Sequence, residues 1–331
     1  MNGSIENNCV NTLRVSITDR CNLRCIYCMP LQGVPLISHD HVMRYEEILR
    51  VIRAGAGLGI RKVRITGGEP LVRKGLTGFV ESIAGINGIE DLCLTTNGVL
   101  LKEYAGPLKR AGMHRVTISL DSLQRRRYER ITGYDRLADV LDGIEACFAA
   151  GLDNLKINVV IVPGINDDEV PDFARLSKAH PLEVRFIERM PLIEKDVTKG
   201  CGVWEKEGMS GEQVRLRIED AFGPMEPVGA GVPVPGPADL YRVPGGTGRI
   251  GFINPVSAPF CATCTRVRLT PEGMLRNCLL REEAVDLRRA VRAGVSDDEL
   301  ASVLRGAMER KFNGKDTPFH AMRKYMVQIG G

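Results

Sequence analysis

Short runs of β-forming residues alternate with longer stretches of helical spacing through the first two-thirds of the chain, and no other feature restricts the fold as strongly. The β-forming runs lie at residues 13–17, 62–66, 91–95, 115–119, 155–162 and 183–187. The stretches of helical spacing lie near residues 45–57, 75–86, 99–111, 136–150 and 167–179. Because strands that alternate with helices form βαβ units, the pattern predicts an α/β fold built on a parallel sheet.

Polar or glycine-rich residues follow nearly every predicted strand. Asp19, Gly68, Asn97, Asp121 and Glu188 stand at five such positions. A (β/α) barrel builds its active site from the loops after several strands, whereas a doubly wound sheet concentrates the site at one switch point. A complete barrel needs eight βα units, and six are present by about residue 190. We therefore expect an incomplete (β/α)6 TIM-type barrel that is open on one side.

The last third of the chain has a different character. We expect residues 1–193 to form the partial barrel and residues 194–240 to form a variable excursion, because Gly and Pro are frequent there. Residues 241–331 are expected to form a smaller C-terminal region that covers the open side of the barrel. Strand-like runs at 248–253, 266–270 and about 274–278 precede helical stretches at about 283–293 and 296–310.

The composition argues against several classes of protein. The 331 residues carry a formal net charge of +4 and only 5% aromatic residues, which disfavours a nucleic-acid-binding surface. No segment approaches the roughly 20 apolar residues that cross a bilayer. The first residues lack the basic region and apolar run of a secretion signal. We therefore expect a cytoplasmic protein that binds neither membranes nor nucleic acid.

Cys21, Cys25 and Cys28, the first triad, follow the first predicted strand with C-x3-C-x2-C spacing. Grouped thiols in a reducing compartment indicate metal or redox chemistry. Zinc is the structural alternative, but a closed zinc site takes four ligands, and the nearest histidine is His39. A [4Fe–4S] cluster held by three thiolates keeps one iron open for another ligand.

Cys261, Cys264 and Cys278, the second triad, again supply three thiols without an obvious fourth ligand. Zinc is a serious alternative here, with His320 or a water in the fourth position. A second iron–sulfur cluster is favoured if the first triad already holds one. The other cysteines are scattered, and we interpret them as small residues without a function; they are Cys9, Cys93, Cys147 and Cys201.

Two arginines follow the second triad directly. If residues 266–270 form a strand, Arg266 and Arg268 face the same way, because alternate side chains share one face. Paired guanidinium groups suit phosphate, which they bind through parallel hydrogen bonds. Arg14, Arg64 and Lys156 lie in or next to other predicted strands. Together these five basic groups indicate a polyanionic small molecule as the ligand.

The motifs resemble those of a known family. The C-x3-C-x-Tyr-C spacing and the Gly-Gly-Glu-Pro segment at residues 67–70 resemble the signature of the radical S-adenosylmethionine superfamily. Over nearly its full length the chain is similar to the GTP 3′,8-cyclase family, also called molybdenum cofactor biosynthesis protein A. The matching segments are residues 16–30, 63–71, 94–98, 118–121, 184–188 and 260–268, with the Gly-Gly ending at 330–331.

The resemblance implies two [4Fe–4S] clusters as cofactors, one on each triad, together with S-adenosylmethionine. It places Tyr27, Gly68, Ser119 and Met190 at S-adenosylmethionine. It implies GTP contacts for seven residues, namely Arg14, Arg64, Thr95, Lys156, Arg266, Val267 and Arg268. It assigns catalysis to Cys21, Cys25 and Cys28 with Arg266 and Arg268. In the family, a 5′-deoxyadenosyl radical takes the ribose 3′ hydrogen of GTP, and C3′ closes onto guanine C8.

The resemblance also implies partners. These are a reductant of the flavodoxin or ferredoxin type and, as the next enzyme, cyclic pyranopterin monophosphate synthase. The chain departs from the family pattern near Cys9, where an expected Gly-Arg segment is not evident, and over residues 194–240. The Gly330-Gly331 ending has two interpretations besides a loose tail, namely a tail that enters the active site and a sulfur-carrier terminus.

Two other functions stay open at this stage. One is a different radical S-adenosylmethionine enzyme with an auxiliary cluster, such as a peptide-modifying maturase. The other is a non-catalytic zinc or nucleic-acid-binding module. The sequence does not decide between a monomer and a homodimer.

Overall fold

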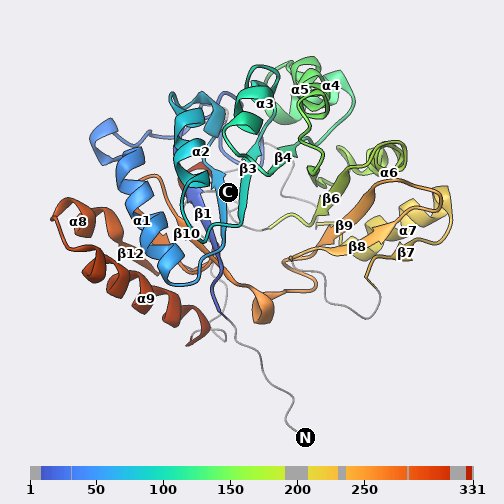
Figure 1. Cartoon of the computed structure of the whole chain (residues 1–331). Coiled ribbons are helices and arrows are strands. Elements are labelled where there is room, and N and C mark those ends of the chain that lie inside the picture. The colour runs from blue at the N-terminus through green and yellow to red at the C-terminus, as the bar shows by residue number, and fades with distance from the viewer. Residues whose placement is uncertain are drawn as a thin grey trace, which may run out of the picture.

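The computed structural model describes residues 9–30, 32–190, 208–229, 236–281, 283–313 and 326–329. These residues form one sheet of twelve strands, in the order β12-β11-β10-β1-β2-β3-β4-β5-β6-β9-β8-β7 (Figure 1). The strands from β10 to β9 in this order run parallel, whereas the outer strands on both sides are antiparallel. The sheet does not close, so the prediction of an incomplete TIM-type barrel is confirmed.

The six strands of the barrel lie where the sequence pattern predicts them. They are β1 (Thr12–Ser16), β2 (Lys62–Thr66), β3 (Asp91–Thr96), β4 (Arg115–Ser119), β5 (Leu155–Val160) and β6 (Glu183–Ile187). The C-terminal strands are β7 (Glu226–Pro227), β8 (Asp239–Arg242), β9 (Arg249–Ile253), β10 (Arg266–Leu269), β11 (Met274–Arg276) and β12 (Ala284–Asp286).

The helices from α1 to α9 cover the outer face of this sheet (Figure 1), and α10 is a short helix near the C-terminus. They are α1 (Tyr45–Gly57), α2 (Leu76–Ala84), α3 (Leu101–Arg110), α4 (Arg125–Thr132), α5 (Leu137–Ala149), α6 (Val170–Ala179), α7 (Gly211–Phe222), α8 (Leu287–Arg292), α9 (Asp297–Asn313) and α10 (Met326–Ile329). Short 3-10 turns lie at η1 (His39–His41), η2 (Pro70–Val72), η3 (Asp167–Glu169) and η5 (Cys261–Thr263).

Alternation along the strands separates an apolar face from a polar one. On β1 and β2, Leu13, Val15, Val63 and Ile65 are fully buried in the apolar core beneath the helices. The residues between them, such as Arg14, are only partly buried. Because successive side chains of a strand point to opposite faces, the basic residues line the inner face of the curved sheet.

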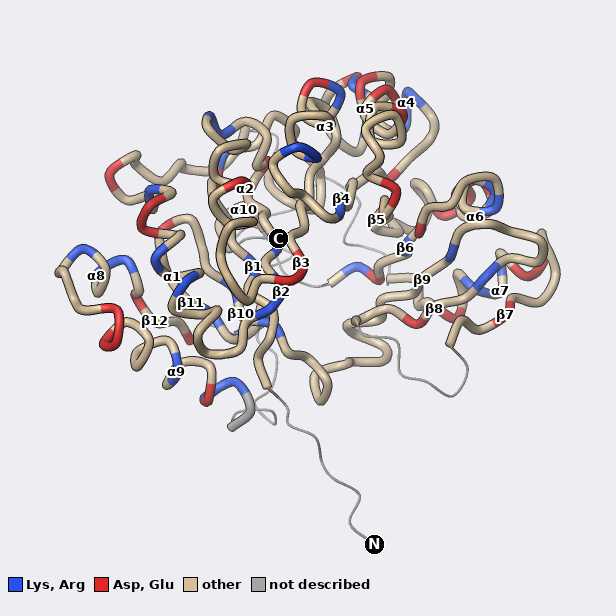
Figure 2. Tube along the Cα trace, viewed as in Figure 1, with Lys and Arg blue, Asp and Glu red and all other residues tan. Residues whose placement is uncertain are grey.

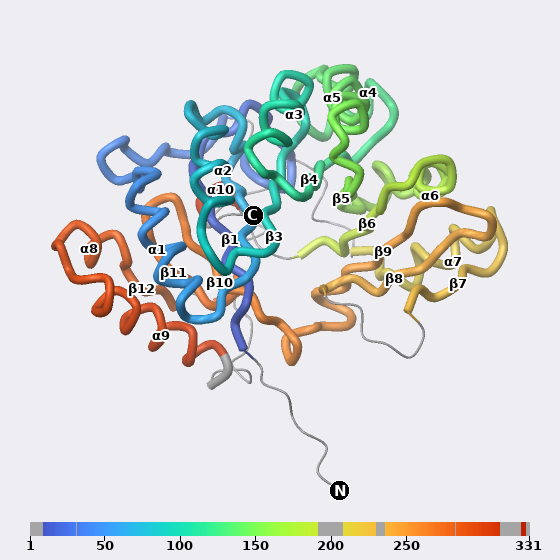
Figure 3. Tube along the Cα trace, in the orientation of Figure 1, coloured from blue at the N-terminus to red at the C-terminus, as the bar shows by residue number. Residues whose placement is uncertain are grey.

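The C-terminal region adds strands beside both outermost strands of the barrel, β1 and β6. β9 pairs in parallel with β6, and β10 pairs in parallel with β1. The chain between them, residues 254–265, therefore crosses from β6 on one side of the open barrel to β1 on the other, as Figure 3 shows in orange. The expected C-terminal region thus reaches the open side, but it does so by adding strands as well as by covering.

The sequence pattern missed several elements. The segment that becomes α4 is too short and too highly charged to show an apolar face, because only Tyr128, Ile131 and Thr132 are buried. Within residues 194–240 the structure contains α7, whose first turn is closed by a capping box of Ser210 and Gln213. That box is visible in the sequence as a Ser followed three residues later by Gln.

Acidic and basic residues are interspersed along the outer helices (Figure 2). Within the described residues no helix combines the length and apolarity needed to cross a membrane.

Candidate active site

The two triads lie at opposite edges of the sheet, the first at the carboxyl ends of the parallel strands and the second at their amino ends. β1 and β10 are parallel and in register, with Thr12 opposite Arg266, so the segment before β10 and the segment after β1 lie at different edges. The first triad follows β1, whereas Cys264 precedes β10 by two residues. β11 is antiparallel to β10, which returns Cys278 to the edge where Cys264 lies. The strands of the barrel therefore separate the two groups of thiols.

The loop that carries the first triad is fixed by backbone hydrogen bonds. Arg24 N donates to Thr132 O at 2.8 Å and Ile26 N donates to Ile131 O at 3.0 Å, which anchors the loop to the end of α4. Cys28 N donates to Cys25 O at 2.9 Å, so the loop turns back on itself. This turn brings thiols that are three and four residues apart toward one another.

Burial dominates the chemistry of the first triad. It raises the pKa of the Cys21 thiol to about 11, with Glu69 acting in the same direction. The pKa values of Cys25 and Cys28 are raised by burial, by neighbouring thiols of the triad and by Asp121. Because the charges of the thiols affect one another, the thiols face a common space. A positively charged iron–sulfur core in that space would favour the thiolate forms.

The Gly-Gly-Glu segment after β2 packs against the beginning of this loop. Gly68 N donates to Thr18 O at 2.6 Å, and a Cβ on Gly68 would lie 2.3 Å from Arg20 O. No other residue fits at this position, because that contact is with backbone. The Gly68 amide is already used, so any contact of Gly68 with a cofactor is made through its carbonyl oxygen.

Glu69 is buried behind the first triad. Its carboxyl group accepts hydrogen bonds from Leu71 N at 2.9 Å, Thr96 Oγ1 at 2.7 Å and Asn97 N at 2.6 Å. Burial raises the Glu69 pKa to about 7 in spite of these donors. Glu69 thus ties the loops after β2 and β3 together at the edge of the sheet that holds the first triad.

Tyr27 lies beside the first triad and donates from its hydroxyl group to Asp121 Oδ2 at 2.5 Å. Asp121 Oδ1 also accepts from Val160 N at 2.7 Å. Burial raises the Asp121 pKa to about 6. Ser119 ends β4 two residues earlier, and Met190 follows β6, so both stand at the same edge of the sheet as Tyr27.

The second triad has basic neighbours. Burial raises the Cys264 pKa, but Arg266 and Lys311 outweigh burial and bring it to about 7. Cys278 Sγ accepts from Leu280 N at 3.4 Å. Cys261 is exposed, and its pKa is raised by burial and by the other two thiols of the triad.

Glu188 fixes the segment that leads to the second triad. Its Oε2 accepts from Val256 N and from Ser257 N, both at 2.9 Å. Glu188 follows β6, whereas residues 256 and 257 begin the crossing from β9 to β10. The buried carboxylate therefore anchors the first part of that crossing.

The inner face of the sheet between the triads is basic. Arg14 lies opposite Arg64 on one side and Arg268 on the other. Burial lowers the Arg14 pKa, and Arg268, Arg64 and Arg266 lower it further. Like charges that are packed together repel one another. This part of the sheet therefore concentrates positive charge on its inner face.

Three contacts orient the arginines. Arg64 donates to Thr95 Oγ1 at 3.1 Å and to Thr117 Oγ1 at 3.0 Å. The Arg266 guanidinium lies over the Phe260 ring, 5.0 Å from its centre. The Val267 side chain, by contrast, is fully buried in the core, so only its backbone can meet a ligand.

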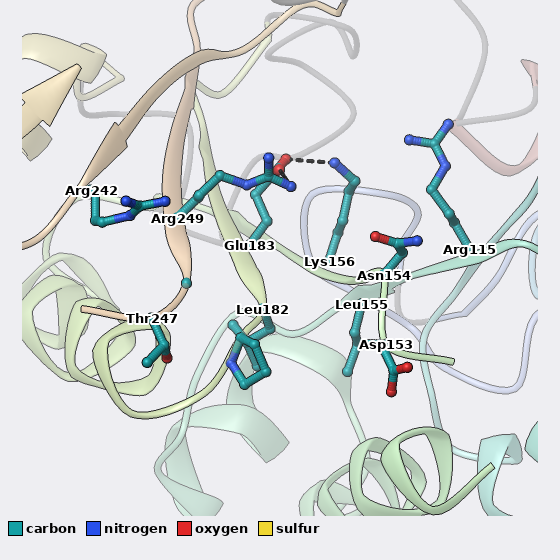
Figure 4. A pocket seen from close by; sticks show the side chains of 12 residues that line it. Arg115, Asp153, Asn154, Leu155, Lys156, Leu182, Glu183, Arg242, Thr247 and Arg249 are labelled. Atoms are coloured by element: carbon teal, nitrogen blue, oxygen red, sulfur yellow. Dashed lines mark hydrogen bonds and ion pairs between the residues drawn. The ribbon is translucent and has the colours of Figure 1, made fainter. Parts of the chain in front are cut away.

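A cavity of about 230 Å³ opens where β4, β5, β6 and β9 begin (Figure 4). Glu183 is buried there and accepts from Lys156 Nζ at 2.8 Å, while Arg249 lies 3.1 Å from its other oxygen. Arg185 also pairs with Glu183. One carboxylate thus holds three cations, and Lys156 reaches the basic inner face with a partner already in place.

The thiols suit an iron–sulfur cluster. In the described part of the chain no three Cys, His, Asp or Glu side chains are placed to hold a single metal ion. A four-iron cluster needs its thiolates farther apart than one ion does, because each thiolate binds a different iron. Three thiols in each triad are a donor set that fits a cluster with one open iron.

Comparisons with known proteins show to which family the chain belongs. Residues 15–177 match the Radical SAM superfamily, and residues 182–317 match Molybdenum Cofactor Synthesis C. The chain is 47% identical over 327 residues to GTP 3′,8-cyclase of Heliobacterium modesticaldum, which covers 97% of this chain and 98% of that protein. It is 45% identical over 328 residues to GTP 3′,8-cyclase of Moorella thermoacetica, with the same coverage. The chain belongs to the GTP 3′,8-cyclase family.

A solved structure supports the fold of this family member. Streptococcus suis SuiB bound to S-adenosylmethionine superposes with a TM-score of 0.61 and 13% sequence identity. The match covers 90% of this chain and 68% of SuiB. At this identity the likeness concerns the fold alone.

The structure of this GTP 3′,8-cyclase family member places the predicted residues in three groups. The first triad, Tyr27, Gly68, Ser119 and Met190 lie at one edge of the sheet. The second triad lies at the other edge. Between them lie the basic residues and Thr95. Cys93 and Cys147 are buried, whereas Cys9 is exposed. Cys201, His320, Gly330 and Gly331 fall outside the described residues.

Sequence reasoning assigned no role to the buried carboxylates that support the site. Glu69 and Glu188 follow strands, and Asp121 follows β4 by two residues, so their positions gave a signal. Glu183 begins β6, and its position in the sequence gave no signal of a role in the site. Its role depends on Lys156 of β5 and Arg249 of β9, which only the sheet order brings beside it.

Proposed function

We propose that this chain is a radical S-adenosylmethionine enzyme that cyclises GTP to (8S)-3′,8-cyclo-7,8-dihydroguanosine 5′-triphosphate, the first step of molybdenum cofactor biosynthesis. The observation that carries the proposal is the row of arginines on the inner face of the sheet, with a group of three thiols at each end. A polyanionic nucleotide bound by the arginines would lie between the two triads. The 43–47% identity to relatives named GTP 3′,8-cyclase supports the same conclusion.

Each group of residues has a distinct task in this proposal. The first triad would hold a [4Fe–4S] cluster, and Tyr27, Gly68, Ser119 and Met190 would surround S-adenosylmethionine. When bound, the cluster and S-adenosylmethionine supply the 5′-deoxyadenosyl radical that takes the ribose 3′ hydrogen. The surrounding protein limits the access of water, because the thiols are only partly exposed and the neighbouring carboxyl groups of Glu69 and Asp121 are buried.

The basic residues would position GTP. Arg14, Arg64, Arg266 and Arg268 would neutralise the triphosphate, and Lys156 would contribute if it exchanges Glu183 for phosphate. Thr95 would orient Arg64 or contact the nucleotide directly. Fixing the ribose in this way places one hydrogen within reach of the radical, which is how positioning contributes to rate.

The second triad would hold a second [4Fe–4S] cluster whose open iron meets the guanine. Support comes from the three thiols and from the basic groups that balance thiolate charge. We further propose the domain limits 1–193, 194–240 and 241–331. A flavodoxin- or ferredoxin-type reductant would supply electrons, and cyclic pyranopterin monophosphate synthase would use the product.

Anaerobic reconstitution tests the proposal. We expect about eight irons per chain, because each three-cysteine triad holds four. With a reductant, S-adenosylmethionine and GTP, the reconstituted protein should form the 3′,8-cyclised nucleotide, identified by mass spectrometry and NMR. Eight irons with S-adenosylmethionine cleavage but no GTP binding would exclude GTP as the substrate.

A further inference from the structure

Lys311 is a buried cation to which the proposed function gives no task. It lies near the end of α9 and is 8% exposed. Its Nζ donates to the backbone carbonyl of Asn277 at 2.8 Å, and the Cys264 and Cys278 thiols act on its pKa. The ammonium group is therefore held beside the second triad by the residue that precedes Cys278.

The position on α9 shows that packing alone does not call for a lysine. Leu300, Leu304 and Ala307 form the buried stripe of this helix. Lys311 follows Ala307 by four residues and so continues the same stripe. A core position that would suit an apolar residue thus holds a charge, which is costly unless an anion balances it.

The groups that act most strongly on the Lys311 charge are two thiols and one guanidinium group. They are the thiols of Cys264 and Cys278, which favour its charged form, and the Arg266 guanidinium, which opposes it. The anion that would balance Lys311 is therefore the second triad in its thiolate form. A cluster on that triad would be anionic, and reduction by one electron would increase its negative charge.

We propose that Lys311 is a positioning residue that sets the reduction potential of the second cluster, because its hydrogen bond to Asn277 O holds a buried positive charge beside the cysteine sulfurs. This inference rests on the proposed function, because it requires an iron–sulfur cluster on the second triad. Hydrogen bonds to the sulfurs and the local charge are among the features that set cluster potentials. A fixed cation stabilises the reduced form more than the oxidised form, so it raises the potential.

A redox titration of the reconstituted full chain, followed by electron paramagnetic resonance, tests the inference. S-adenosylmethionine binds the first cluster, so the signal that changes when it is added identifies that cluster. In Lys311→Met we expect the ratio of reduced to oxidised second cluster to fall about tenfold at a fixed potential, which is about 59 mV for one electron. The first cluster should titrate as in the parent protein.

Three further variants separate charge from packing. Lys311→Arg keeps the charge and should restore the parent potential to within about a quarter of the Lys311→Met shift. Lys311→Gln keeps a hydrogen-bond donor without the charge, so its second-cluster potential should lie between those of Lys311→Met and the parent protein. If Lys311→Met loses its cluster, the potential of Lys311→Gln tests the inference in its place. Arg310→Met removes a neighbouring exposed charge from the same helix and should leave both potentials unchanged.

The outcomes distinguish the inference from the proposed function. Eight irons with an unchanged second potential in both neutral variants would overturn the assignment of Lys311 alone. An equal shift of both clusters would also overturn it, because the effect would then not be local. Zinc on the second triad with four remaining irons would overturn the second cluster and, with it, the role of Lys311.

Discussion

The two triads contain the same number of thiols in different surroundings. The first lies among buried carboxyl groups and neutral donors, and the pKa of Cys21 is raised to about 11. The second lies beside Arg266 and Lys311, and the pKa of Cys264 falls to about 7. The surroundings of Cys21 thus oppose negative charge, whereas those of Cys264 favour it.

This difference suits two tasks. A cluster in surroundings that oppose negative charge is harder to reduce and, once reduced, gives up its electron more readily. Such a cluster suits the reductive cleavage of S-adenosylmethionine. A cluster among cations suits the binding of an anionic nucleotide, because the same cations attract phosphate.

The largest effect should come from exchanging single ligands of the two triads. Cys25→Ser should abolish 5′-deoxyadenosine formation, because the cluster that reduces S-adenosylmethionine loses a thiolate. Cys264→Ser should keep that reaction and lose the cyclised nucleotide. Liquid chromatography of both products checks this, with the exposed Cys9→Ser as the control. Normal 5′-deoxyadenosine formation in Cys25→Ser would contradict the assignment of the first triad.

The next effect concerns the arginines between the triads. Arg266→Ala removes a charge-assisted contact worth on the order of 1.5–3 kcal/mol, so the affinity for GTP should fall roughly tenfold or more. Cleavage of S-adenosylmethionine should continue without cyclisation. Arg268→Ala should behave alike, and exposed Arg305→Ala should not change binding. Calorimetry measures the affinity, and unchanged GTP binding in both variants would exclude a phosphate-binding role.

A smaller, pH-dependent effect should come from Glu69. Its pKa is raised from 4.5 to about 7, so between these values the folded state holds a proton that the unfolded state has released. The free energy of unfolding should therefore fall as the pH rises through this range. Glu69→Gln should remove on the order of 2–3 kcal/mol of that pH dependence.

Urea unfolding at about pH 5 and about pH 8 measures the Glu69 contribution by linkage. Exposed Glu103→Gln on α3 serves as the control and should keep the parent pH dependence. If the free energy of unfolding of Glu69→Gln changed with pH as much as that of the parent protein, Glu69 would titrate normally in the folded protein.

The smallest effect should come from Glu188→Gln. The amide can still accept from the Val256 and Ser257 amides, but the charge is lost, which should lower the free energy of unfolding by about 1 kcal/mol. Because Glu188 anchors the chain that leads to the second triad, iron should be lost from that triad first. Iron analysis after dilution checks this, and equal loss from both triads would contradict it.

The strands of the barrel could be predicted because their signal is local. Each alternates apolar and polar residues over five or six positions, and the predicted limits of β2, β4 and β6 agree with the structure. The parallel pairing of β10 with β1 could not be predicted, because its hydrogen bonds join residues far apart in the sequence. The same holds for β9 beside β6.

The residues of the site also differ in whether the sequence alone predicts them. The cysteines and arginines could be identified because their chemistry is carried by residue type and spacing. The carboxylates that hold these groups in place could not, because Glu183 and Glu69 act through partners on other strands. Lys311 was missed for a related reason, since a single lysine in a helix resembles a surface residue until its burial is known.

The pairing of β10 with β1 has a consequence for the order of events during synthesis. Thr12 lies opposite Arg266, about 250 positions later. While the ribosome makes the intervening chain, the free edge of β1 has no neighbour to bond with, and an open strand edge invites pairing with other chains. The nascent protein therefore carries an aggregation hazard until its last quarter emerges, and its yield in the cell should depend on chaperones that shield this edge.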